Sequence, residues 1–172
     1  RIVMAALRHI PDDRVEIPGL LGKSRNITIS IWANLRVGDT SGAEAVSLGD
    51  YVGIRLDGNG NKGVMGFYYD GTTWHATTTG TFYAGAGWHH VVYVIDASNT
   101  SQNVYIDGVV MGSTAHTQSL SYVGLGSNTF IGKHGNGVGT YDFNGLIDDV
   151  RVYNRALSNQ EIQNLYNIGI NP

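Results

Sequence analysis

Two adjacent aspartates near the end of the chain, Asp148 and Asp149, are placed to bind a metal ion. They lie within residues 145–153, whose β-favouring residue types predict a strand. Because side chains alternate between faces along a strand, Asp148 would share the face of the apolar Val150 and Val152. A buried carboxylate has to be ion-paired, hydrogen-bonded or metal-bound. We therefore expect a backbone or arginine partner, a bend in the strand before Val150, or a structural calcium ion.

Aromatic side chains near predicted loops, with polar side chains beside them, form a second chemical group. Sugar-binding sites commonly set an aromatic face against the apolar side of a sugar ring, with polar groups hydrogen-bonding its hydroxyls. The candidate ligand-binding residues of this kind are Tyr68, Trp74, His75, Tyr83, His134, Asn136 and Tyr141. In the alternative interpretation, Tyr68 and Trp74 only pack on a face of a sheet. The set predicts a carbohydrate site built from loops.

Patterns for catalysis are weak, and we assign no catalytic residue. A retaining glycosidase needs two carboxylates facing the same sugar bond, and three carboxylates on one strand would supply them. Here Glu16, Glu44 and Glu161 fall in different predicted elements. Asp148 and Asp149 are neighbours on a strand, so their side chains would point to opposite faces. The chain also lacks a Gly-x-Ser-x-Gly nucleophile motif.

The adjacent histidines His89 and His90 could suggest a metal site. Adjacent side chains of a strand diverge, so the two imidazoles cannot form a simple pair of ligands. We expect one of them to be packed and the other to face solvent.

Composition narrows the class of protein further. A net charge of −3 with 11 lysines and arginines argues against a nucleic-acid or anionic-membrane surface. No apolar run approaches the roughly 18–20 residues that cross a bilayer, so we expect no membrane insertion. The chain has no cysteine, which excludes disulfides and thiolate chemistry. Its 172 residues predict one domain, residues 1–172.

The elements that would position these groups are short strands. Runs of β-favouring residues alternate with turns rich in glycine, asparagine and aspartate, and Asp70-Gly71 and Asp107-Gly108 are typical of hairpins. The predicted strands are residues 2–7, 14–17, 26–35, 44–48, 51–56, 63–69, 73–77, 88–95, 102–106, 109–111, 128–132 and 145–153, with a polar linker over 113–127. Many short strands without alternating helices predict an all-β sandwich or barrel.

One helix is predicted, over residues 158–167. Ser158 and Glu161 have the spacing of a capping box at its start. Ile162, Leu165 and Tyr166 then form one apolar face. In the strand 26–35 the isoleucines share one face, so Trp32 on the other face needs a separate cover.

Four motifs make the chain resemble a laminin-G-like domain of the concanavalin A-like jelly-roll group. They are TISIWA at 28–33, WHHV at 88–91, VYIDG at 104–108 and FNGLIDDVRVYNRAL at 143–157. In this order and at these spacings they cover nearly the whole chain. The resemblance implies a jelly-roll sandwich of two antiparallel sheets, to which the sequence adds one short C-terminal helix.

The resemblance also bears on a structural calcium ion. An aspartate near the first strand often helps to hold calcium in this family, and Asp13 aligns with the motif. We therefore predict Asp13, Asp148 and Asp149 as the metal ligands. Ile10 stands where the family has another aspartate, which weakens this calcium prediction.

In function, the resemblance implies a binding module. Our leading hypothesis is a non-catalytic, extracellular or cell-surface module that binds carbohydrate or mediates adhesion within a larger protein. The alternative is a structural or assembly module that contacts protein partners and has no sugar site. A glycoside-active enzyme is a third and weaker hypothesis, because the carboxylate-bearing strand is missing. The sequence does not define an oligomeric state.

Overall fold

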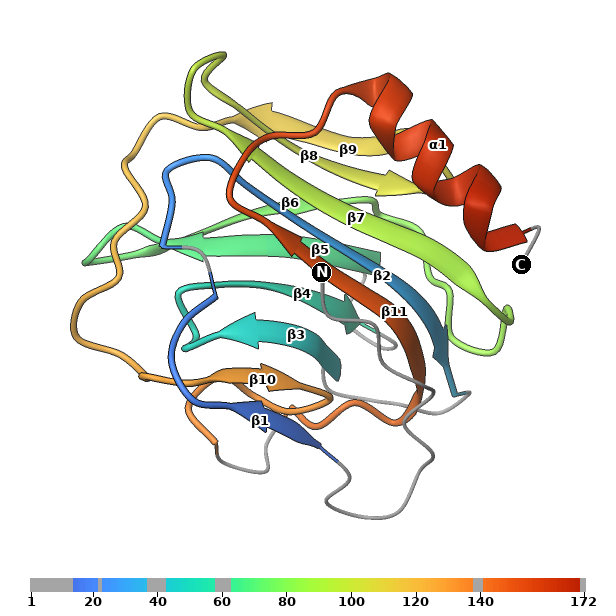
Figure 1. The fold of residues 1–172 in the computed structure, drawn as a ribbon, viewed down its shortest axis with the longest axis horizontal. Helices are drawn as coiled ribbons and strands as arrows, with labels where there is room; N and C mark the ends of the chain where they lie inside the picture. Colours follow the sequence, from blue (N-terminus) through green and yellow to red (C-terminus); the bar gives the residue numbers. More distant parts are fainter. Residues whose placement is uncertain (1–13, 22, 37–42, 58–62, 138–140, 171–172) are drawn as a thin grey trace.

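The chain folds into two antiparallel sheets packed face to face, with one helix on the outside (Figure 1). The structure is a computed structural model, and it describes residues 14–21, 23–36, 43–57, 63–137 and 141–170. The six-stranded sheet has the order β1-β10-β3-β4-β5-β6 and the five-stranded sheet the order β11-β2-β7-β8-β9. The strands are β1 (Val15–Ile17), β2 (Ile27–Leu35), β3 (Ala43–Leu48), β4 (Val52–Asp57), β5 (Gly63–Tyr69), β6 (Trp74–Thr78), β7 (His89–Asp96), β8 (Ser101–Ile106), β9 (Val109–Ala115), β10 (Thr129–Ile131) and β11 (Gly145–Tyr153). This confirms the predicted all-β jelly-roll sandwich.

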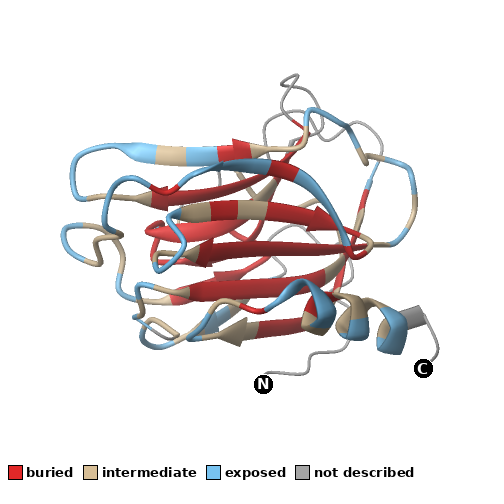
Figure 2. Cartoon of the chain, turned by 90° about the horizontal axis from the view of Figure 1, so that it is seen from above, coloured by how far each residue is buried: buried red, intermediate tan, exposed pale blue. Residues whose placement is uncertain are grey.

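The core lies between the two sheets. Ile27, Ile29 and Ile31 of β2 face inward and are fully buried, as their alternation predicts. They join buried residues from the opposite sheet, including Ile54 and Tyr68. Figure 2 shows buried strands at the centre and exposed loops around them. The period-two pattern of β2 therefore predicts which of its side chains face the core.

The helix α1 (Asn159–Ile170) covers the outer face of the five-stranded sheet. Ile162 and Leu157 pack on Val92 and Val94 of β7, and Tyr166 stacks on Trp32 with 5.9 Å between ring centroids. The helix thus supplies the cover that Trp32 needs.

The predicted capping box is also present at the start of α1. The Ser158 amide donates to Glu161 Oε2 at 2.9 Å, and the Glu161 amide donates to Ser158 Oγ at 3.3 Å. Two backbone donors at the start of the helix are thereby satisfied.

Strand β11 departs from the regular alternation assumed above. A bulge shifts its register between Asp148 and Arg151, and Asp149 adopts a left-handed φ of 47°. Asp148 pairs with Trp32 on the outer face, while Val150 is buried in the core. The expectation that Asp148 shares the face of Val150 is therefore wrong, and the bend before Val150 is the alternative that holds.

One other expectation changes at an element boundary. Strand β9 continues to Ala115, because it pairs with β8 along its whole length, so the polar linker begins later than predicted. The predicted strand 2–7 lies outside the described residues.

Within the described part of the chain, no helix has the length and apolar character needed to cross a membrane.

Candidate functional site

A buried cluster of ionisable side chains lies on the outer face of the six-stranded sheet. Glu44 points outward from β3, between the inward-facing Ala43 and Ala45, yet it is fully buried. His134 Nε2 lies 3.6 Å from Glu44 Oε2 and 3.5 Å from Asp50 Oδ1. One ligand atom from each of these three residues lies within 4.8 Å of the others, so the group could hold a metal ion.

The loop that follows β10 covers Glu44. The Gly135 amide donates to Glu44 Oε2 at 3.2 Å, and the Glu44 amide donates to the Tyr141 carbonyl at 2.8 Å. From the sheet side, Arg55 of β4 lies 3.4 Å from Glu44 Oε1. The guanidinium of Arg55 is 4.2 Å from the centre of the Tyr141 ring and 5.5 Å from that of Phe67. Glu44 is therefore enclosed by polar groups on both sides.

The electrostatics of the cluster reflect its burial. Burial raises the pKa of Glu44 to about 8, although Arg55 and the Gly135 amide act in the opposite direction. Burial also raises the pKa of Asp50, against the lowering effect of His134 and Arg55. Two carboxylates in such an environment favour a bound cation or proton over free ionisation.

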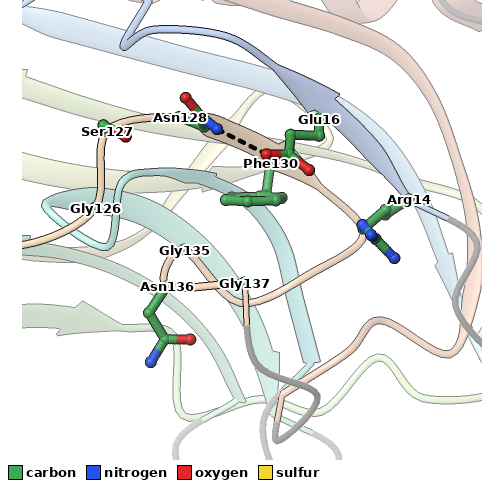
Figure 3. Close-up of a pocket in the computed structure, with 9 residues that line it drawn as sticks. All are labelled: Arg14, Glu16, Gly126, Ser127, Asn128, Phe130, Gly135, Asn136 and Gly137. Carbon is green, nitrogen blue, oxygen red and sulfur yellow. Dashed lines mark hydrogen bonds between the residues drawn. The ribbon is translucent and has the colours of Figure 1, made fainter.

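A pocket of about 300 Å³ lies beside this cluster (Figure 3). The residues that line it are Arg14, Glu16, Gly126, Ser127, Asn128, Phe130, Gly135, Asn136 and Gly137. The Phe130 ring lies between the Glu16 side chain and the loop at Gly137, and Asn128 Nδ2 donates to Glu16 Oε1 at 2.6 Å. The Asn136 side chain extends away from Phe130 (Figure 3), and its Oδ1 is 2.5 Å from His134 Nδ1. Asn136 thus links the pocket wall to the buried cluster.

Glycines shape the floor between pocket and cluster. A Cβ at Gly135 would lie 2.6 Å from Asp50 Cα, and one at Gly126 would lie 2.7 Å from the Gly135 carbonyl oxygen. The Gly126 amide also donates to the Gly49 carbonyl at 3.0 Å. Larger residues at these positions would push the three segments apart.

Trp74 lies next to this region. It pairs with Tyr69 across β5 and β6, its side chain is 50% exposed, and its Nε1 donates to the Asp50 carbonyl at 3.2 Å. Of the predicted ligand-binding residues, His134, Asn136, Tyr141 and Trp74 are therefore gathered around one turn, at Asp50.

The remaining predicted ligand-binding residues lie elsewhere. Tyr68 is fully buried and stacks on His75 at 4.8 Å, and it meets His116 edge-on. Tyr83 contacts His89 at 4.7 Å, on the five-stranded sheet. The seven residues do not form one site.

The two adjacent histidines diverge as expected. His90 is buried, with its Nε2 2.9 Å from Ser30 Oγ. His89 is partly exposed, and its Nδ1 is 2.7 Å from Asp107 Oδ2.

Two of the predicted metal ligands, Asp148 and Asp149, lie at the bulge of β11. Asp149 contacts Arg151 through both carboxylate oxygens, at 2.8 Å to Nε and 2.5 Å to Nη2. Asp148 Oδ1 accepts a hydrogen bond from the Asp149 amide. Asp13 lies outside the described residues.

Sequence reasoning missed Glu44, Asp50 and Arg55. Glu44 gives one usable signal, since it is a lone carboxylate in the otherwise uncharged strand AEAVSL. Asp50 follows Gly49 in the turn between the predicted strands 44–48 and 51–56, and both residues adopt a left-handed φ. The meeting of this turn with the loop at residues 134–136 depends on packing between distant segments.

The sequence matches a known family over most of its length. The family model described as the concanavalin A-like lectin/glucanases superfamily covers residues 11–163. A search of curated proteins finds no match to the sequence.

Several solved structures share the fold. Domain 4 of AbnA, a GH43 extracellular arabinanase from Geobacillus stearothermophilus, was solved with arabinotriose; it has a TM-score of 0.70 and 23% identity, over 89% of this chain and 72% of that one. The binding domain of Paraclostridial Mosquitocidal Protein 1 has a TM-score of 0.70 and 17% identity over 96% of this chain. The binding domain of botulinum neurotoxin DC, in complex with rat synaptotagmin II, has a TM-score of 0.65 and 15% identity over 95% of this chain. The match spans only 43% and 42% of these two toxin domains.

Proposed function

Because the chain belongs to the concanavalin A-like lectin/glucanase superfamily, we propose that it is a non-catalytic module that binds carbohydrate at the pocket around Phe130. The observation that carries this proposal is the make-up of that pocket. An aromatic floor, a carboxylate, an amide and a guanidinium surround a hollow of about 300 Å³. Such a combination suits a sugar ring, which has both apolar faces and hydroxyl groups.

The backbone around the pocket supports the same proposal. Three of the lining residues are Gly126, Gly135 and Gly137, so a ligand can approach the main chain closely there. The half-exposed Trp74, held by the turn at Asp50, offers a further aromatic face beyond the pocket. The arabinotriose in the structure of the arabinanase domain makes furanose oligosaccharides a suitable first class of ligand.

Titration calorimetry with a panel of oligosaccharides, including arabinotriose, tests the proposal. Arg14→Ala and Glu16→Gln should each lower the affinity for the ligand at least about tenfold, because each removes a charged hydrogen-bonding partner. Lys23→Ala is the matched control: it removes an exposed cation that does not line the pocket, so affinity should not change.

Two outcomes would contradict the proposal. If no polysaccharide or glycan in a broad array binds the folded chain, the module has no sugar site. If a glycan binds but the pocket variants keep full affinity while Trp74→Ala abolishes it, the site is elsewhere on the sheet.

The absence of catalysis is part of the proposal. The three glutamates lie on separate elements: Glu16 on β1, Glu44 on β3 and Glu161 on α1. Glu44 is fully buried against Arg55, which suits it poorly for protonating a substrate. Incubation with polysaccharides should release no sugar, and released sugar would overturn this part.

We also propose that residues 1–172 form one domain that works outside the cell, in a larger secreted or surface protein. The arabinanase whose domain 4 shares this fold is extracellular. Fractionation of cells that produce the whole protein should recover it at the surface or in the medium.

The second candidate function is a module that contacts other proteins. It is favoured by three consecutive exposed apolar residues, Val109, Val110 and Met111, on the edge strand β9. The neurotoxin binding domain of the same fold was solved with a protein partner. Self-association in solution that Val110→Lys abolishes, together with a blank glycan array, would support this function over sugar binding.

Calcium at Asp13, Asp148 and Asp149 stays a proposal that rests on the family resemblance. The described residues fit it poorly, because both oxygens of Asp149 already contact Arg151. Calcium should raise the melting temperature of the chelator-treated chain if the ion binds there. Asp148→Asn should then remove the effect, and an unchanged melting temperature at saturating calcium contradicts the proposal.

A further inference from the structure

We propose that Glu44, Asp50 and His134 bind one first-row divalent cation, for which Zn²⁺ is the best fit. The three residues come from β3, from the turn after it and from the loop after β10. All three are buried, and they are distinct from the aspartates that the sequence offered as calcium ligands.

The hydrogen bond between His134 and Asn136 is the first argument. His134 Nδ1 lies 2.5 Å from Asn136 Oδ1, and an amide oxygen can only accept, so Nδ1 carries the proton. In the neutral imidazole, Nε2 therefore presents a lone pair. That lone pair faces Glu44 Oε2 and Asp50 Oδ1, which are also acceptors when ionised. Three acceptors that converge in a buried place need a cation or a proton between them.

The distances favour the cation over the proton. The Nε2–oxygen distances of 3.6 and 3.5 Å exceed those of N–H···O hydrogen bonds, which are about 2.7–3.2 Å. In a tetrahedral zinc site with bonds of about 2.0–2.2 Å, neighbouring ligand atoms lie about 3.3–3.6 Å apart. The two measured distances fall in that range. The ligand atoms of Glu44 and Asp50 lie within 4.8 Å of each other. The two carboxylates need to move only slightly closer to complete the set of three ligands.

The donor atoms select the class of metal. Calcium takes six to eight oxygen ligands, whereas imidazole nitrogen suits zinc and other first-row transition metals. Two carboxylates and one imidazole form a three-residue set that leaves a fourth position for water. Asn136 then acts as the outer partner that orients the histidine, as such sites commonly have.

The surroundings are compatible with a doubly charged ion. Ionised Glu44 and Asp50 together carry two negative charges, and Arg55 supplies one positive charge. Arg55 contacts Glu44 through Oε1, while Oε2 accepts from the Gly135 amide and lies 3.6 Å from His134 Nε2. The guanidinium also lies 4.2 Å from the centre of the Tyr141 ring.

The ion would join the turn at Asp50 to the loop at residues 134–137, which forms one wall of the pocket. Metal removal should therefore loosen that wall and weaken any ligand bound there. This last consequence rests on the proposed sugar site, whereas metal binding itself does not.

Calorimetric titration of the chelator-stripped chain with zinc, manganese and calcium salts tests the inference. We expect one zinc ion per chain, with calcium bound at least about 100-fold more weakly. Asp50→Asn and His134→Asn should each weaken zinc binding at least about 100-fold. Asn136→Ala, which removes only the outer partner, should weaken zinc about 10-fold. His75→Asn is the matched control, because it alters a histidine–carboxylate pair away from the cluster and should leave zinc affinity unchanged.

A second measurement keeps the test independent of folding defects in the variants. Substitution with Co²⁺ should give the visible absorption of a near-tetrahedral site, and His134→Asn should remove it. No bound metal in the wild type, or a zinc affinity in Asp50→Asn and His134→Asn equal to that of the wild type, overturns the inference. If the metal-stripped chain binds sugar but no zinc, only the metal site is refuted. If the chain binds zinc but the glycan array is blank, only the proposed sugar-binding function is refuted.

Discussion

At the scale of single residues, burial decides what an ionisable group can do. His90 lies beneath α1, 5.4 Å from the Trp32 ring and 6.1 Å from the Tyr166 ring. Burial lowers the pKa of His90 to about 4, helped by Arg151 and opposed by Asp107. The residue is therefore held neutral in the folded chain at pH values where it would be protonated in the unfolded chain.

This predicts a stability that depends on pH. The unfolded chain binds a proton at His90 below a pKa of about 6.5, but the folded chain does so only below about 4. Stability is therefore fully present above pH 6.5 and is lost as the pH falls towards 4, with about 2 kcal/mol lost by pH 5. Urea unfolding of the wild type and of His90→Gln at pH 7 and pH 5 measures the difference. An equal loss in both proteins would contradict this prediction.

Single residues of the site are only partly predictable from the sequence. The sequence singles out His134, Asn136, Tyr141 and Trp74 as polar or aromatic residues near loops, and these do lie around Asp50. It did not find Glu44, because a single carboxylate in a strand does not reveal whether its face is solvated or covered. Only the loop at Gly135, folded back over β3, makes Glu44 a buried group.

At the scale of elements, local patterns predicted most of the structure. Period-two alternation located eleven strands that the structure describes, and the capping box located the start of α1. The end of β9 was missed because Gly112, Ser113 and Thr114 lack an apolar alternation, and pairing with β8 imposes the strand instead. The bulge at Asp149 was missed for a similar reason, since it is a departure from the pattern itself.

The helix start gives a prediction at this scale. Ser158→Ala removes the side-chain oxygen that accepts from the Glu161 amide, and it should lower the free energy of unfolding by about 1 kcal/mol. Thermal unfolding followed by circular dichroism measures the change. Ser119→Ala, at an exposed serine between β9 and β10, should have little effect, and equal effects of the two substitutions would refute a capping role.

At the scale of the whole molecule, close contact between the sheets determines stability. A Cβ on Gly66 of β5 would lie within the ring of Tyr93, which belongs to β7 in the other sheet. Tyr93 is fully buried, and its hydroxyl donates to Gln102 Oε1 at 2.7 Å. The ring therefore has little freedom to move aside.

Gly66→Ala should accordingly destabilise the chain by roughly 1–3 kcal/mol. A double-mutant cycle isolates the cause, because Tyr93→Leu removes the ring that the new methyl group would meet. The cost of Gly66→Ala should shrink in the Tyr93→Leu background. Additive costs would show that the strain arises elsewhere.

The arrangement of the sheets was predictable from the resemblance, but the site was not. The pocket forms where the turn at Gly49, the segment at Gly126 and the loop at Gly135 meet, and these segments are separated in sequence. Their meeting depends on how β3 and β10 pair, which no local pattern records.

The glycine contacts beneath the pocket have a consequence for diversification of the module. Gly126 and Gly135 line the hollow and Gly49 packs against Gly126, while Arg14 and Glu16 line it from the start of the chain's described part. Substitution of the three glycines would disrupt the local backbone geometry, whereas substitution of Arg14 or Glu16 leaves that geometry intact. The chain therefore combines a constant frame with a variable rim, and a library randomised at positions 14 and 16 would vary the rim of the hollow while it keeps the glycines beneath.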